Sequence, residues 1–173
     1  MQTSESIYLP KGTAAILTKD EIDFVVACAR RKMEIKIEVG MSLTNIGFLG
    51  TSEEKEVMAI GAEFAFARMI GLTQENMPNL ISNEYFDFLI NGKTIDVKAT
   101  KHEFGRLFIP FEKSQKRHAE IFALIRQASQ NVYIFDGAAT AEKLIQADNF
   151  YMPPGFRSKI YNLSFNELGD LEL

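Results

Sequence analysis

Residues 85–100 read YFDFLINGKTIDVKAT, and this stretch predicts a β-hairpin. Asn91-Gly92 lies between two runs in which apolar and polar side chains alternate, a pattern typical of a two-residue hairpin turn. Counting outward from a loop of Asn91 and Gly92, Asp87 is expected to pair with Asp96. Directly paired residues have Cβ atoms about 4.5–5.5 Å apart, so the two carboxylates should repel each other. A divalent cation between them would explain why both are present.

Lys98 is expected on the same face of this hairpin as the two acids. Side chains alternate faces along a strand, so Asp96 and Lys98 share one face while Ile95 and Val97 take the other. The apolar side chains of both strands therefore predict one face packed on a core. The opposite face collects Asp87, Asp96 and Lys98 within one side-chain reach.

The composition indicates one soluble, intracellular domain. The chain has 173 residues, of which 46% are hydrophobic and 14 are Phe, so a sizeable core is expected. No apolar run approaches the roughly 18 residues of a membrane span, and residues 1–12 lack the pattern of a secretory signal. The single cysteine, Cys28, lies in the apolar stretch VVACA and is interpreted as a core residue. We therefore expect a cytoplasmic protein that does not enter a membrane.

Two capping boxes predict two helices before the hairpin. Residues 18–21 (TKDE) and 51–54 (TSEE) have the required spacing. The first helix is expected to end near Lys32, because alternating apolar and charged residues over 33–40 indicate a strand. The second helix is expected to run to about Ile70. The segments before and between these elements are expected to be irregular.

The rest of the chain predicts a mixed α/β layout around one sheet. The later strands are expected at 106–111, 119–127, 131–137 and 160–165, with a helix as the alternative for 119–127. A polar connection is expected at 112–117 and a short helix at 138–147. The domain prediction is a single domain over 1–173, with a core at about 52–147, an N-terminal extension at 1–51, and a C-terminal strand and tail at 148–173.

Glu63 is a carboxylate on an otherwise apolar face of the second predicted helix. Its neighbours at helical spacing are Ala59, Ile60, Phe66 and Ala67, none of them charged. A buried carboxylate is costly unless it is paired or bound to a metal. Glu63 is therefore either a residue at the margin of the buried face or a third acid of the hairpin site. Three carboxylates without a Cys or His cluster favour Mg²⁺ or Mn²⁺ over Zn²⁺.

These residues resemble the PD-(D/E)XK nuclease superfamily, which has the restriction-endonuclease-like fold. The pattern is an acid on the first core helix, an acid near the end of one strand, and acid-x-Lys on the next strand. Here the pattern is Glu63, Asp87 and Asp96-Val97-Lys98. The chain departs from it in having Phe, not Pro, before Asp87, and Asp, not Glu, at position 96. The likeness covers roughly residues 52–147 and is similar to small phage and bacterial members of unassigned function.

The resemblance implies a Mg²⁺- or Mn²⁺-dependent nuclease acting on DNA, with a central mixed sheet flanked by helices. Asp87, Asp96 and the Val97 carbonyl would bind the metal. Glu63 would bind it directly or through water, and Lys98 would be the catalytic lysine.

Positive charge is concentrated after the hairpin. The whole chain has a net charge of −4, but the window from Lys98 to His118 holds six Lys or Arg and two Glu, which leaves −8 for the rest. This window is either a solvated loop or a surface that contacts phosphates. Gln115 is a candidate because some superfamily members place a functional Gln after the last motif. The candidate nucleic-acid-binding residues are Lys101, His102, Arg106, Lys113, Gln115, Lys116, Arg117 and His118.

Three interpretations stay open. The first is a metal-dependent nuclease, expected to be a structure-selective or restriction-like endonuclease that could act as a homodimer. The second is a catalytically inactive protein with the nuclease fold that serves as a DNA-binding or assembly module. The third is a surface network of ion pairs between the hairpin acids and Lys98 and Lys93.

Overall fold

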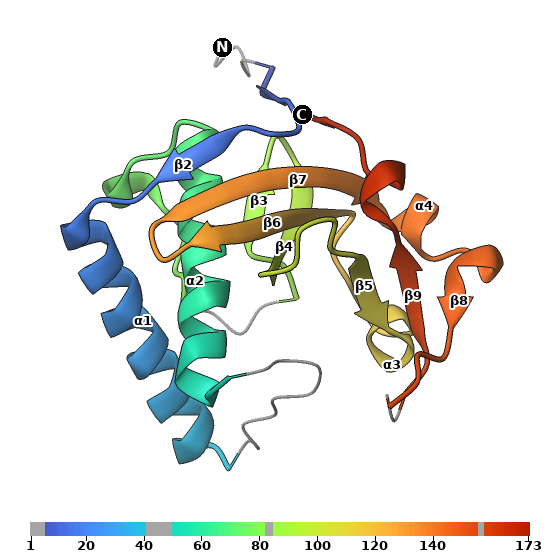
Figure 1. The fold of residues 1–173 in the computed structure, drawn as a ribbon, viewed down its shortest axis with the longest axis horizontal. Coiled ribbons are helices and arrows are strands. Elements are labelled where there is room, and N and C mark those ends of the chain that lie inside the picture. Colours follow the sequence, from blue (N-terminus) through green and yellow to red (C-terminus); the bar gives the residue numbers. More distant parts are fainter. Residues whose placement is uncertain (1–5, 41–49, 82–84, 156–157) are drawn as a thin grey trace.

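A five-stranded sheet forms the centre of the molecule. The computed structural model describes residues 6–40, 50–81, 85–155 and 158–173. The strand order is β2-β7-β6-β4-β3, and every neighbouring pair is antiparallel except β4 with β6 (Figure 1). The five strands are β2 (Ala14–Ile16), β3 (Phe88–Ile90), β4 (Lys93–Thr100), β6 (Ile121–Ser129) and β7 (Val132–Thr140). The predicted mixed α/β class is therefore confirmed.

Two helices cover one face of this sheet. They are α1 (Lys19–Glu38) and α2 (Ser52–Met69). Both predicted capping boxes are present, at Thr18 and Thr51. Helix α2 lies between α1 and the sheet (Figure 1), so residues 60–67 are all buried. None of the helices among the described residues is long and apolar enough to cross a membrane.

The strand predicted over residues 33–40 is wrong, because α1 continues to Glu38. Alternating apolar and charged residues fit a strand, but they also leave Lys32 and Lys36 one helical turn apart. Lys36 Nζ lies 2.6 Å from a carboxylate oxygen of Glu56 on α2. Packing against α2 therefore decides the conformation of this segment, which the local pattern could not do.

A second, smaller sheet packs on the opposite face of the main sheet, so the expectation of one sheet is wrong. Its order is β5-β9-β8, with β5 (Leu107–Pro110), β9 (Ile160–Leu163) and β8 (Phe150–Tyr151). Leu107 and Leu163 from this sheet share a buried cluster with Phe122 and Leu124 of β6. The apolar pattern predicts the strands correctly but does not say which sheet each joins.

Several shorter elements differ from the sequence-based expectation. The predicted polar connection 112–117 contains one helical turn, and the helix predicted at 138–147 is also a single turn because β7 continues to Thr140. Residues 1–17, expected to be irregular, supply β2 and a terminal strand that pairs with the last strand. Most of the loop expected at 41–50 lies outside the described residues. The remaining elements are β1 (Tyr8–Leu9), β10 (Leu171–Glu172), α3 (Phe111–Ser114), α4 (Ala141–Leu144) and the 3-10 turns Gln74–Asn76, Ala147–Asn149 and Phe165–Glu167.

Candidate functional site

The hairpin has the predicted turn and register, but its ladder of paired residues ends at Phe88 and does not include Asp87. The paired residues are Phe88 with Ile95, Leu89 with Thr94, and Ile90 with Lys93. The backbone N–H of Asp87 donates to the Ile95 carbonyl at 2.8 Å, so Asp87 and Phe88 both lie against Ile95, as in a β-bulge.

This bulge changes the predicted direct pairing of Asp87 with Asp96. The Asp87 carboxylate instead accepts a hydrogen bond from the Val97 N–H at 2.7 Å. A strand residue sends its N–H and C=O to the same side, so the Val97 carbonyl also projects toward the open edge of β4 beside Asp87. The carboxylate repulsion is thereby reduced without separating the acids completely.

The site residues approach this edge from both faces of the sheet. Val97 and Phe88 are buried in the core that contains α2, so Glu63 arrives from that side. Asp96 is paired with Phe122 of β6, which belongs to the cluster on the opposite face. Asp96 and Lys98 therefore project away from α2. Glu63 on one face and Asp96 with Lys98 on the other can meet because β3 is short and leaves the edge of β4 open.

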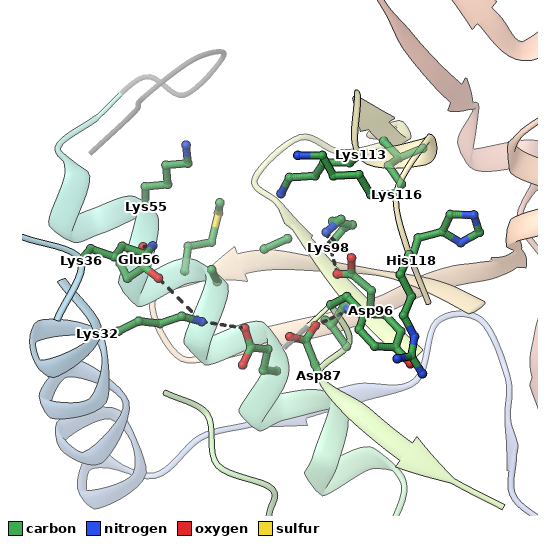
Figure 2. Close-up of a pocket in the computed structure, with 18 residues that line it drawn as sticks. Lys32, Lys36, Lys55, Glu56, Asp87, Asp96, Lys98, Lys113, Lys116 and His118 are labelled. Carbon is green, nitrogen blue, oxygen red and sulfur yellow. Dashed lines mark hydrogen bonds and ion pairs between the residues drawn. The ribbon is translucent and has the colours of Figure 1, made fainter. Parts of the chain in front are cut away.

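All the residues predicted to form the site line one pocket, with a volume of about 710 Å³ (Figure 2). Its lining also includes four of the eight candidate phosphate-contacting residues. The lining residues are Lys32, Lys36, Lys55, Glu56, Met58, Ala59, Glu63, Tyr85, Asp87, Asp96, Val97, Lys98, Ala99, Ile109, Lys113, Lys116, Arg117 and His118. The structure thus brings residues of α1, α2, β4 and the segment after α3 to one place.

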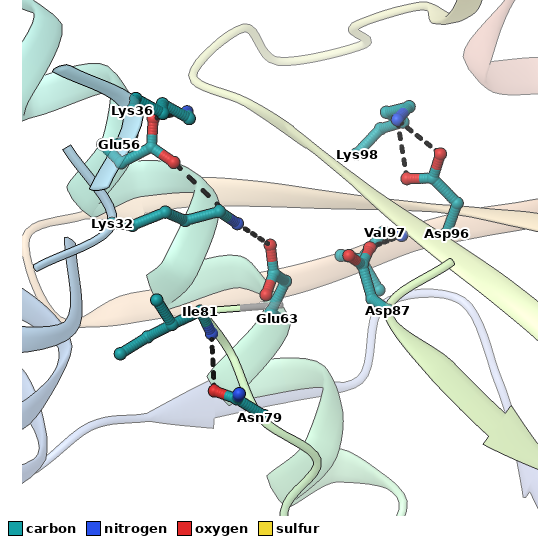
Figure 3. Close-up of polar contacts among 10 residues, drawn as sticks. All are labelled: Lys32, Lys36, Glu56, Glu63, Asn79, Ile81, Asp87, Asp96, Val97 and Lys98. Atoms are coloured by element: carbon teal, nitrogen blue, oxygen red, sulfur yellow. Dashed lines mark hydrogen bonds and ion pairs between the residues drawn. The ribbon is translucent and has the colours of Figure 1, made fainter. Parts of the chain in front are cut away.

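Glu63 is 6% exposed and faces a lysine of α1. Lys32 Nζ lies 3.7 Å from Glu63 Oε1 and 3.9 Å from Glu56 Oε1 (Figure 3). Burial, with repulsion from Asp87 as a smaller cause, raises the pKa of Glu63 to about 8 despite Lys32. The alternative of a margin residue that reaches solvent does not hold, because this carboxylate is enclosed.

Asp87 and Asp96 differ in how their charges are balanced. Burial and the nearby charge of Asp96 raise the pKa of Asp87 to about 6, against the effect of the Val97 N–H. Lys98 Nζ lies 2.6 Å from both carboxylate oxygens of Asp96 (Figure 3). Lys93, the other lysine of the predicted surface network, pairs with Glu120 at 3.1 Å instead. The ion pair expected between Lys98 and a hairpin acid is therefore present, and the one expected for Lys93 is not.

The chemistry of the donors fits a hard divalent cation. Carboxylate oxygens and the Val97 backbone line one pocket, and burial, with repulsion between the acids as a smaller cause, raises the pKa of Glu63 and of Asp87. Over the described ranges, no three Asp, Glu, His or Cys side chains are already gathered as a metal-binding group. Asp96 would have to turn away from Lys98 to join such a group.

The candidate phosphate-contacting residues divide into two sets. Lys113, Lys116, Arg117 and His118 line the pocket, and the Arg117 guanidinium lies 4.4 Å from the centre of the Tyr85 ring. The other four lie outside the pocket lining, namely Lys101, His102, Arg106 and Gln115.

Arg106 and Gln115, two of these four, make side-chain contacts within the fold. Arg106 Nε donates to Asn162 at 2.6 Å and so links β5 to β9. Gln115 follows the single turn of α3 and donates to the Ser114 hydroxyl at 3.1 Å. Neither contact directs the side chain toward the acids.

Sequence reasoning missed the lysines that α1 and α2 contribute to the pocket, which are Lys32, Lys36 and Lys55. The signal for two of them is the i, i+4 spacing of Lys32 and Lys36, which becomes visible once α1 is extended past Lys32. Glu56, near the N-terminus of α2, is also buried in the pocket and paired with both of those lysines.

Comparisons with protein-family models, with curated proteins and with solved structures found no match to this chain. The resemblance to PD-(D/E)XK nucleases therefore stays a prediction that depends on Glu63, Asp87, Asp96 and Lys98.

Proposed function

We propose that this chain is a metal-dependent nuclease that hydrolyses phosphodiester bonds in DNA. One observation supports it above all: three acids and a lysine, from α2, the start of β3 and β4, line a single pocket that is otherwise rich in lysine. An acid, a second acid and acid-x-Lys from separate elements are what this chemistry needs, because a phosphodiester requires both charge neutralisation and an activated water.

The cofactor that fits the donors is Mg²⁺ or Mn²⁺. When bound, it would activate a water molecule and neutralise charge on a phosphoryl oxygen. Asp87, Asp96 and the Val97 carbonyl would hold it, with Glu63 contributing directly or through water. The bulge at Asp87 supports this assignment, because it presents the Asp87 carboxylate and the Val97 backbone together at the open edge of β4.

The chain's own residues have distinct tasks in this proposal. The Lys98 ammonium would stabilise negative charge that develops on the phosphate, since it is 30% exposed within the pocket. Lys32 holds the buried Glu63 carboxylate in place from α1. The more exposed lysines around the pocket would contact neighbouring phosphates and orient the strand.

The alternative is a catalytically inactive protein of this fold that binds DNA or assembles with a partner. The observation that favours it is the tight pairing of Lys98 with both oxygens of Asp96, which withdraws two residues from catalysis. In the first proposal this pair must open when metal and substrate bind. In the alternative it is permanent.

Cleavage assays separate the two proposals. The protein is incubated with supercoiled, linear, single-stranded and branched DNA in Mg²⁺ or Mn²⁺, and products are resolved by electrophoresis. We expect cleavage by the wild type, and losses of at least about 10²-fold in Asp96→Ala and Lys98→Ala, as for other charge-stabilising groups. Lys93→Ala, on the same strand, is the matched control and should keep full activity because it removes only an exposed ion pair.

An inert wild type that also binds no metal by calorimetry would overturn the nuclease proposal. An inert wild type whose DNA affinity survives in Asp87→Asn/Asp96→Asn would favour the inactive module.

A further inference from the structure

The pocket has the opposite charge to the rest of the molecule. Its lining holds seven Lys or Arg and four Asp or Glu, a net charge of +3, whereas the whole chain carries −4. The residues outside the pocket therefore sum to −7. A positive cavity in a negative protein attracts anions to one place and repels them elsewhere.

Lysines from three elements face each other across this pocket. Lys36 of α1 and Lys55 of α2 lie on one side, and Lys113 of α3 lies on the other (Figure 2). Among the described residues, no carboxylate is within ion-pairing distance of Lys113. Partial desolvation lowers the pKa of Lys113, and the ammonium groups of Lys98, Lys36 and Lys55 lower it further, while Asp96 opposes them. An external anion would relieve this repulsion.

The acids of the pocket are less exposed than Lys113. The side chains of Glu63 and Asp96 are 8% and 19% exposed, whereas Lys113 is exposed. A volume of about 710 Å³ is that of a small-molecule site and admits roughly one or two nucleotides. A double helix has both backbones on its outside and its bases stacked, so it could lay only one backbone across the mouth of the pocket and could not place a base inside it. A single strand can.

An aromatic ring stands beside the cations. Tyr85 lines the pocket next to Arg117, which lies over its ring. Cations that follow a backbone, together with an aromatic ring beside them, are typical of channels for single-stranded nucleic acid.

We propose that Lys36, Lys55 and Lys113 form a phosphate subsite that admits nucleic acid as a single strand and leads it to the acids. The inference deepens the proposed function and rests on it for the cleavage chemistry, but not for binding. The substrate class it names is single-stranded DNA, or a single-stranded segment of a branched or frayed duplex.

The test is fluorescence anisotropy in EDTA, with a labelled oligothymidine and a labelled duplex of the same length, over a range of salt concentrations. We expect the wild type to bind the single strand more tightly. Lys113→Gln should lower the slope of log K against log salt by about 0.7, the value for one phosphate contact on a single strand. At 0.1 M salt this corresponds to about fivefold weaker binding. Lys19→Gln removes the same charge from the far end of α1 and should leave affinity unchanged.

An equal effect of the two substitutions, or duplex binding as tight as single-strand binding, would overturn the subsite. Because EDTA removes metal, this outcome is independent of cleavage. Wild-type protein that shows the Lys113 effect but never cuts DNA would overturn the nuclease and leave the subsite standing. Protein that cuts DNA but binds it equally with and without Lys113 would overturn the subsite and leave the nuclease proposal standing.

Discussion

Glu63 carries the least favourable charge in the pocket. It is enclosed by α2, the sheet and Lys32, and its neighbours on the same helix are apolar. Its raised pKa means that the folded chain binds a proton at Glu63 more tightly than the unfolded chain does. A buried acid with a strongly raised pKa is more typical of a functional site than of a structural one.

The pH dependence of stability in metal-free protein tests whether the pKa of Glu63 is raised. The pKa of Glu63 rises from 4.5 to about 8 on folding, so its contribution is most favourable below the unfolded value and is lost as the pH rises through about 8. Between about pH 5 and about pH 8.5, the Tm of the wild type should therefore fall more than the Tm of Glu63→Gln. We expect the difference to reach at least about 2–4 °C, the shift that 1 kcal/mol produces in a chain of this size.

Differential scanning calorimetry in EDTA measures the Tm of the wild type and of Glu63→Gln at each pH. The exposed Glu53, on the same helix and paired with Arg30, provides the control, because Glu53→Gln should change with pH as the wild type does. Parallel curves for wild type and Glu63→Gln would show that the Glu63 carboxylate is not held as the structure indicates.

Helix α2 positions Glu63 by packing closely on β7. Gly61 lies on the sheet-facing side of α2, and a Cβ atom there would overlap with the hydroxyl of buried Tyr133. That hydroxyl accepts a hydrogen bond from Gln127 at 2.9 Å, so it is fixed in place. Glycine is therefore required at this position by the distance between two elements, and not by a special backbone conformation.

Gly61→Ala should destabilise the protein by about 1–3 kcal/mol, the usual range for overpacking a core. Urea denaturation followed by circular dichroism measures this loss. The matched comparison is the same substitution in a Tyr133→Leu background, where the overlapping ring is gone and the added loss should largely vanish. Equal losses in both backgrounds would mean that α2 and β7 do not approach as closely as described.

The pocket is a product of the whole molecule. It needs α1 and α2 on one face of the main sheet, the small sheet on the other, and a short β3 between them. Burial of the Glu63 and Asp87 carboxylates at this junction is unfavourable in the metal-free chain, and a cation that binds there selectively should stabilise the fold.

Thermal unfolding with and without metal tests this coupling. Mg²⁺ or Mn²⁺ at about ten times its Kd should stabilise the wild type by about 1.4 kcal/mol, or roughly 3–6 °C in Tm. Asp87→Asn/Asp96→Asn should not respond, because two of the expected ligands lose their charge. Calcium-free buffer and matched ionic strength are needed, so that screening is not mistaken for binding. Equal shifts in both proteins would indicate non-specific binding.

Local patterns in the sequence determined a large part of this structure. The Asn91-Gly92 turn, the register next to it and both capping boxes depend on residues within a few positions of each other, and all are confirmed. Glu63, Asp87, Asp96 and Lys98 were also singled out from local patterns. Alternation places Asp96 and Lys98 on the face away from α2, however, and it is the open edge of β4 that lets them line one pocket with Glu63. The buried strands at 119–127 and 131–137 were recognisable from their apolar runs.

Tertiary structure decided what local patterns leave ambiguous. Residues 33–38 alternate like a strand, but contacts with α2 make them helical and so bring Lys32 and Lys36 into the pocket. The Asp87 carboxylate accepts from the Val97 N–H instead of lying opposite Asp96, and the separation into two sheets depends on which apolar face each strand can bury. These outcomes arise from contacts between residues distant in the chain, whose free energies are set by packing and burial and leave no signature in the neighbouring sequence.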